Sequence, residues 1–244
     1  MEIRTILRGA LAGAFAGVLA SVFARVFAEP VIDKAIDYES GRDDVLAAMN
    51  KAAGRPIAPD GPEIFPRSIQ STVGIATGLI AFSAAMGALI AVAYLVMHGR
   101  FQVRARSLVW MIAAFGFFVV YGVLIGLLPS LGDLSANVAA GNQFGYARAA
   151  TETPQPIVNI LSTPLTVNGR TIAPGQIVYP GFDADVLWKF RWYSLLNQLL
   201  IWTTIALVFG ALLERFQQGR PKKAKGSPAE AAAPARTGEP VPAG

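Results

Sequence analysis

The chain has 244 residues, of which 53% are hydrophobic and only 15% are charged, and its mean hydropathy is +0.45. Soluble domains carry about 25% charged residues, so this composition favours an integral membrane protein. The lack of cysteine excludes disulfides and thiolate metal sites, and a single histidine, His98, excludes a multi-histidine cluster within this chain. The sequence has no P-loop, dinucleotide fingerprint, nucleophile elbow or zinc-protease motif, so we expect neither an enzyme nor catalytic residues.

The first apolar stretch, 5–28, exceeds the roughly 20 residues that a helix needs to cross a bilayer. It lacks the features of a cleaved signal peptide, so we expect a retained span. Gly9, Gly13 and Gly17 recur at every fourth position and therefore form one groove, in which another helix can come close. Pro30, at the membrane boundary, is a position where the helix could kink.

The end of this first span carries a charged stripe at the same spacing of four. Glu29, Asp33 and Asp37 lie on one helix face, where their carboxylates could collect a hard or borderline divalent cation at the mouth of a pore. The alternative is an ordinary solvated face, with Arg25 and Glu29 as an i,i+4 pair. The pattern of 31–53 predicts an amphipathic helix beyond the membrane.

Three further apolar stretches predict membrane spans at about 72–97, 107–129 and 188–214. The predicted fold is an all-α integral membrane bundle of four transmembrane helices over residues 1–216, with outer loops at 29–71 and 130–187. The remainder, 217–244, is basic and then rich in alanine, proline and glycine. It cannot bury a core, so we expect it to be disordered.

The orientation follows from the basic segments that flank the spans. With four spans, all of them fall on one side: Arg4/Arg8, Arg100–Arg106 and Arg215–Lys225. The positive-inside rule makes that side cytoplasmic, together with both termini, and places the acidic loops outside. We therefore expect a multi-pass protein of a bacterial cytoplasmic (inner) membrane, whose basic segments attract anionic lipids rather than nucleic acid.

The fourth predicted span contains polar side chains. Asn197 and Gln198 fall within the hydrocarbon region, where an unpaired amide is costly, so they should face other helices or a hydrated path. Both alternatives stay open, because interhelical hydrogen bonds worth about 0.6 kcal/mol each are common in membrane bundles. Ser194 lies on the same polar side. Arg191, near the outer boundary, could snorkel outward or pair with the carboxylates that follow the first span.

The outer segment before the fourth span has a hairpin pattern. In LTVNGRTIAPGQIV, apolar residues alternate on both sides of Asn168-Gly169, which favours a tight β-hairpin turn. An isolated hairpin is marginally stable. We therefore expect it to lie on the ends of the helices or on a partner protein.

Two stretches also carry a family resemblance. The first comprises LRGALAGAFAGVLA and FARVFAEPVIDKAIDYE, and the second is FDADVLWKFRWYSLLNQLLIWTTIALVFGALLERF, from Phe182 to Phe216. With weaker echoes in PDGPEIFPRSIQSTVGIATG and LLPSLGD, they resemble the CbtA family of predicted cobalt transporter subunits. The resemblance implies an integral membrane subunit that moves cobalt for cobalamin synthesis beside a small histidine-bearing partner, CbtB.

The sequence departs from that family at two places. Many CbtA-like chains have histidines in the first outer loop, whereas 39–66 has none. They also usually carry further membrane helices where this chain has the polar, proline-containing segment 130–181. Either a partner supplies metal ligands or the metal role has been lost.

Two functions remain open at this point. The first is a membrane subunit of a divalent metal transport system of the cobalt type, with cobalt as transported substrate rather than cofactor. Its collector would be the three carboxylates, and its path the face with Asn197 and Gln198. The alternative is a non-transporting scaffold or accessory subunit that docks partner helices and an extracytoplasmic protein. Four spans rarely enclose a pathway, so both predict a homo-oligomer or a partner membrane subunit.

Overall fold

The structure is a computed structural model, and it describes residues 2–56, 66–127 and 152–218. Four helices in these ranges are long and apolar enough to cross a membrane: Glu2–Ala52, Arg67–Met97, Ala105–Gly122 and Ala184–Phe216. The prediction of four long apolar helices is therefore confirmed. The end of the third predicted span, at 128–129, and nearly all of the predicted disordered tail lie outside the described residues.

The long helices are composed of α-helical and π-helical segments. The first contains α1 (Glu2–Phe23), η1 (Ala24–Ala28) and α2 (Glu29–Ala52). The second contains α3 (Arg67–Ile69), η2 (Gln70–Gly74) and α4 (Ile75–Met97). The third contains α5 (Ala105–Phe117) and η3 (Phe118–Leu127), and the fourth is the single helix α9 (Ala184–Gln218).

The first helix passes Pro30 without a break, although this proline could have kinked it. Proline has no N–H to donate, and its ring clashes with the carbonyl four residues before it. The backbone accommodates it by widening the preceding turn, so that the Glu29 N–H donates to the Ala24 carbonyl, five residues back. The π-helical turn η1 thus joins α1 and α2 into one continuous helix.

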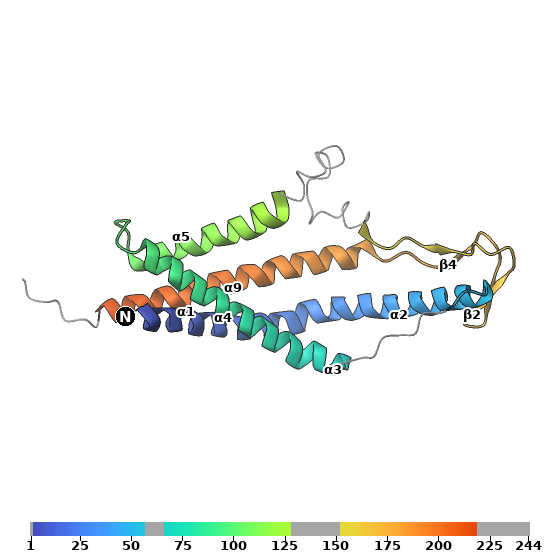
Figure 1. The fold of residues 1–244 in the computed structure, drawn as a ribbon, viewed down its shortest axis with the longest axis horizontal. Helices are drawn as coiled ribbons and strands as arrows, with labels where there is room; N and C mark the ends of the chain where they lie inside the picture. Colours follow the sequence, from blue (N-terminus) through green and yellow to red (C-terminus); the bar gives the residue numbers. More distant parts are fainter. Residues whose placement is uncertain (1, 57–65, 128–151, 219–244) are drawn as a thin grey trace, which may run out of the picture.

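The long helices α1, α9 and α5 lie side by side, and α4 crosses α1 obliquely and meets α5 near their connecting turn (Figure 1). α1 packs against α4 on one side and α9 on the other, and α5 packs against α9 (Figure 1). Small side chains on α1 allow both neighbours to approach, namely the buried Ala12, Ala16 and Ala20. Larger residues from α9 fill the remaining space, among them Ile201, Trp202, Ile205 and Phe209.

The contact between α1 and α4 is made by backbone atoms. A Cβ added at Gly13 would collide with the carbonyl oxygen of Ser83, and one at Gly17 would lie 2.5 Å from the Cα of Ile80. Gly9 meets the backbone of α4 in the same way, one turn further along. No side chain fits between the two helices at these positions, so α4 lies directly in the glycine groove.

One end of the bundle gathers the basic segments. The N-terminus, the turn between α4 and α5 and the C-terminal end of α9 lie together at the left of Figure 1. Arg8 stacks on the ring of Phe216, 3.9 Å from its centroid, and Arg106 lies 3.9 Å from the carboxylate of Glu214. The carboxylates of the charged stripe, Glu29, Asp33 and Asp37, lie toward the opposite end.

A stalk, defined as α2 with the strands packed on it, extends from that opposite end. Strands β2 (Leu165–Val167) and β3 (Arg170–Ile172) pair antiparallel through a turn in which Asn168 has φ 49° and Gly169 has φ 74°. Two positive φ angles identify the type I′ turn that the sequence indicated, so the hairpin prediction is confirmed. A second pair joins β1 (Ile157–Val158) to β4 (Ile177–Tyr179).

The strands of the stalk lie on the distal half of α2. Val45 and Met49 of α2 form a small apolar core with Ile157 and Leu165. Closer to the bundle, the Tyr179 hydroxyl donates to the Tyr38 carbonyl at 3.1 Å, and the Tyr38 hydroxyl donates to the Pro180 carbonyl at 2.9 Å. The outer segment is therefore fixed along α2 by both apolar and polar contacts.

Candidate functional site

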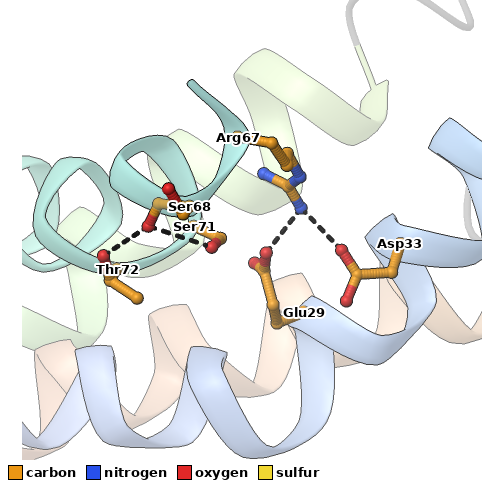
Figure 2. A network of polar contacts seen from close by, with 6 residues as sticks. All are labelled: Glu29, Asp33, Arg67, Ser68, Ser71 and Thr72. Atoms are coloured by element: carbon orange, nitrogen blue, oxygen red, sulfur yellow. Dashed lines mark hydrogen bonds and ion pairs between the residues drawn. The ribbon is translucent and has the colours of Figure 1, made fainter. Parts of the chain in front are cut away.

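The carboxylates that follow the first predicted span are paired with an arginine from another helix. Figure 2 shows Arg67, at the start of α3, extending toward Glu29 and Asp33 at the start of α2. Its Nη2 donates to Glu29 Oε1 at 2.5 Å and to Asp33 Oδ1 at 3.0 Å. One guanidinium nitrogen thus serves both carboxylates and ties the outer ends of the first two long helices together.

Glu29 is the most unusual member of this cluster. Its side chain is only 2% exposed, against 56% for Asp33 and 34% for Arg67. Burying a carboxylate is costly unless it is paired and its oxygens are hydrogen-bonded. Yet Glu29 Oε2 and Arg67 Nε are both buried without a hydrogen-bond partner in the described part of the chain. The ion pair is therefore incomplete on both sides.

A mostly apolar groove with a few polar side chains lies one helical turn further toward the membrane, between the π-helical turns η1 and η2. Its volume is about 330 Å³, and its polar lining comprises Ser21, Arg25, Ser71 and Thr72. The Ser21 hydroxyl donates to the Val18 carbonyl at 2.8 Å, and the Thr72 hydroxyl to the Ser68 carbonyl at 2.6 Å. Because their protons are used in this way, both oxygens keep lone pairs for a cation.

The three predicted metal ligands are distributed unevenly. Glu29 and Asp33 meet at Arg67, whereas Asp37 lies further along α2 and is exposed. Among the residues that the structure describes, no group of three or more His, Cys, Asp or Glu side chains could hold a metal ion. His98 lies at the far end of α4, beside the ring of Tyr94. The assignment of the three carboxylates to a metal stays a prediction.

Arg191 does not take up the alternative of pairing with Glu29 or Asp33. It forms an ion pair with Glu152 of the outer segment. The physical reason is placement, since Arg191 is on α9 whereas the two carboxylates point toward α3 and share Arg67. Arg191 therefore ties the outer segment to the start of α9.

The predicted amides of α9 lie at the level of η1. Phe27 and Tyr193 place the two helices side by side there, with ring centroids 5.8 Å apart. One turn further along α9, Asn197 is 8% exposed, and its Oδ1 has no partner in the described residues. The same holds for the Oε1 of Gln198, and Ser194 is half-buried beside them. These oxygens do not form the interhelical hydrogen bonds that a purely structural role would use.

Sequence reasoning missed two polar residues of the contact between the first and second long helices. Arg67 is the last charged residue before the second apolar stretch, and that position was its signal. Ser83 is fully buried against Gly13, and its Oγ has no partner in the part of the chain described. A serine among small residues gives no signal, because it is common at helix contacts in membranes.

Comparison with known families supports a specific assignment. A family model described as "probable cobalt transporter subunit (CbtA)" matches residues 2–137 and 127–214. No curated protein and no solved structure matches the chain. The two family matches together cover nearly the whole of residues 2–214, and the family is one of transporter subunits rather than enzymes. The chain belongs to the CbtA family of probable cobalt transporter subunits.

Proposed function

We propose that this multi-pass membrane protein is the membrane subunit of a divalent-cation transport system of the cobalt type, and that Glu29 and Asp33 form its outer collecting site. The buried Glu29, whose Oε2 has no partner among the described residues although Oε1 is paired with Arg67, is the observation that carries this proposal. Carboxylate and hydroxyl oxygens suit hard and borderline divalent cations. Cobalt itself enters through the family description.

The groove and the α9 amides suggest a direction of travel. A cation that leaves the carboxylates would first meet the hydroxyls of Ser21, Ser71 and Thr72. The buried oxygens of Asn197 and Gln198 lie at the level of η1, where α9 packs against the first helix. Intramembrane polar groups without protein partners mark ion or water paths more often than lipid-facing surfaces.

The basic end of the bundle supports an orientation. Arg8, Arg106 and the C-terminal end of α9 gather at one end, and the carboxylates lie at the other. By the positive-inside rule the basic end is cytoplasmic. The collecting site and the stalk would then face outward, as required for cation uptake.

The arrangement of the four helices favours assembly. α4 and α9 pack against α1, and the part of the α1 surface that they leave uncovered exposes large apolar side chains, among them Leu7, Leu11, Phe15 and Val22. Four helices rarely enclose a path, so we propose that a second copy or a partner membrane subunit completes it. A histidine-bearing partner would add the nitrogen ligands that cobalt accepts and this chain scarcely offers.

Cobalt uptake in cells tests this proposal. A strain that lacks the gene is complemented with the wild type, Glu29→Gln, Asp33→Asn or the control Asp37→Asn, with and without a candidate partner. Uptake should be lost with Glu29→Gln, strongly reduced with Asp33→Asn and retained with the exposed control. Uptake that is unaffected by deletion or by both site variants, at equal membrane levels, would contradict the proposal.

A scaffold or accessory role is the second candidate, and the stalk is the observation that favours it. α2 has 24 residues, which is about 36 Å of helix. It packs against α9 near the bundle, and its far part extends beyond the bundle and holds two strand pairs. Such a projection suits the docking of an extracytoplasmic protein. A stalk-dependent partner in native purification, together with normal uptake by Glu29→Gln, would favour this role.

A further inference from the structure

We propose that Arg67 is a built-in competitor for the transported cation: its guanidinium occupies the Glu29–Asp33 pair at rest, and a divalent cation enters by displacing it. This inference rests on the proposed function, because it assigns a selectivity and gating role to a residue of that same site. Arg67 would therefore be a specificity-determining residue rather than a cation ligand.

The geometry of the ion pair differs from that of a structural lock. An arginine that holds a carboxylate permanently uses two parallel N–H donors, which adds strength and fixes the geometry. Here a single nitrogen, Nη2, reaches both Glu29 and Asp33. Arg67 Nε and Glu29 Oε2 are left buried without partners in the described chain. Displacement of the guanidinium therefore breaks two hydrogen bonds from a single nitrogen, rather than a bidentate pair of bonds to each carboxylate.

The charges make the competition selective for divalent ions. Glu29 and Asp33 carry two negative charges, and Arg67 neutralises only one of them. A monovalent cation offers no more charge than the guanidinium that it would replace, whereas a divalent cation neutralises both carboxylates.

The displaced guanidinium has a place to go. Arg67 is the first residue of α3, directly after the extended Pro66, and its side chain is 34% exposed. It can therefore swing into water without unfolding a helix. The cation side has space as well, because the groove between η1 and η2 begins one turn further in. Single π-helical turns are frequent at functional sites, and here one lies on each side of the groove.

The test uses the lack of cysteine in the chain, which allows one introduced thiol to be modified alone. Purified Arg67→Cys is treated with a reagent that attaches an ammonium group, or with one that attaches a neutral methyl group. Co²⁺ binding is measured by equilibrium dialysis with mass spectrometry. Removal of the positive charge should tighten Co²⁺ binding by about tenfold or more, because a neighbouring charge strongly disfavours a cation in a partly buried site. The ammonium adduct should restore the wild-type affinity, and the methyl adduct should not.

Three controls define the outcome. Arg170→Cys, on the exposed hairpin, should bind Co²⁺ like the wild type with either adduct. In the Glu29→Gln background, Arg67→Cys should no longer tighten binding. Na⁺ should compete with Co²⁺ better in Arg67→Cys than in the wild type, since the barrier to monovalent ions has been removed.

The results separate this inference from the proposed function. If Co²⁺ binds through Glu29 but its affinity is independent of the charge at position 67, the competitor role is overturned and the collecting site stands. If folded wild type and Arg67→Cys both fail to bind Co²⁺ at millimolar concentrations, the collecting site itself is overturned, and the competitor with it. A weaker affinity in the methyl adduct than in the ammonium adduct would also overturn the inference.

Discussion

The contact between the first and second long helices consists of backbone packing in one half and of an ion pair in the other. Within the bundle, Gly9, Gly13 and Gly17 press directly on the backbone of α4, with no side chain between them. At the outer end, the same helices are held by the ion pairs of Arg67 with Glu29 and Asp33. The first half cannot move without losing its packing, whereas the second would, on the proposed mechanism, exchange the guanidinium for a divalent cation. The glycine contact of Gly9, Gly13 and Gly17 with α4 is called the seam below, and the ion pair of Arg67 with Glu29 and Asp33 is called the clasp.

The largest effect should come from disturbing the fixed seam with Gly13→Ala. The added methyl group would meet the Ser83 carbonyl at a distance that no real Cβ contact has, so the helices must separate. We expect a loss of about 2–3 kcal/mol in the free energy of unfolding, at the upper end of typical overpacking costs. Unfolding in detergent micelles measures it.

The matched control for this substitution is Gly78→Ala on α4, where nothing lies within 4 Å of the added atom. It gains helix propensity and meets no neighbour, so it should be neutral or slightly stabilising. Equal destabilisation by both substitutions would show that helix backbone effects, and not the seam, decide the outcome.

A smaller effect on stability but a complete loss of uptake should follow from Glu29→Gln. The substitution removes the buried charge and leaves Arg67 with Asp33 alone. Breaking a buried pair typically costs 3–5 kcal/mol, but Arg67 is one-third exposed and can find water, so we expect about 2 kcal/mol. The same unfolding measurement gives the stability. If uptake persists while stability falls, the ion pair at the outer end only stabilises the helix contact, as the seam does, and has no role in transport.

The next smaller effect concerns Arg191→Gln, which removes the other ion pair near this end. It ties α9 to Glu152 and not to α4, so its loss should free the outer segment and leave the clasp intact. We expect about 1 kcal/mol of local stability to be lost, since both partners are partly exposed. Hydrogen exchange should increase in 152–182, and the exposed Lys189→Gln should have no effect. Faster exchange at η1 and η2 instead would indicate that the two ion pairs act as one unit.

The smallest effect on stability is expected from Thr72→Val, which keeps the shape of the side chain and removes a hydroxyl from the groove. Its hydrogen bond to the Ser68 carbonyl is local, so the change should cost less than about 1 kcal/mol. Co²⁺ uptake should nevertheless fall several-fold if the groove oxygen meets the passing ion. Thr77→Val, on an exposed face of the same helix, is the control. Unchanged uptake in Thr72→Val would show that the Thr72 hydroxyl does not contact the cation, and would leave the carboxylates paired with Arg67 as the proposed binding site.

Local patterns in the sequence predicted the elements of the fold. Apolar length predicted the four long helices, and the Asn168-Gly169 turn predicted the hairpin. The spacing of four in Gly9, Gly13 and Gly17 indicated a surface for close helix contact, and α4 lies against it. Each of these features depends on residues within one continuous segment of the chain, so a single sequence is enough to find it.

The partners across the fold could not be predicted in the same way. Arg67 reaches Glu29 across 38 residues of sequence, and Arg191 reaches Glu152 across 39. Such pairs depend on which helices are neighbours, and periodicity along one helix contains no information about the helix beside it. The charged stripe predicted that the helix continues beyond Pro30, but it did not predict the π-helical turn that accommodates the proline, because such a turn has no sequence signature comparable to a cap or a turn.

The continuous first helix is also a lever. Its 51 residues span about 75 Å, of which α2 contributes about 36 Å and extends beyond the bundle at its far end. A tilt of about 10° at η1 would carry the far end of α2 through about 6 Å by this geometry. The strand pairs ride on that end, fixed to it by Val45 and Met49. A protein bound at the far end of α2 would therefore apply a bending force to the first helix at η1. Conversely, a small tilt of the helix near Glu29 and Asp33 would produce a larger displacement of the strand pairs.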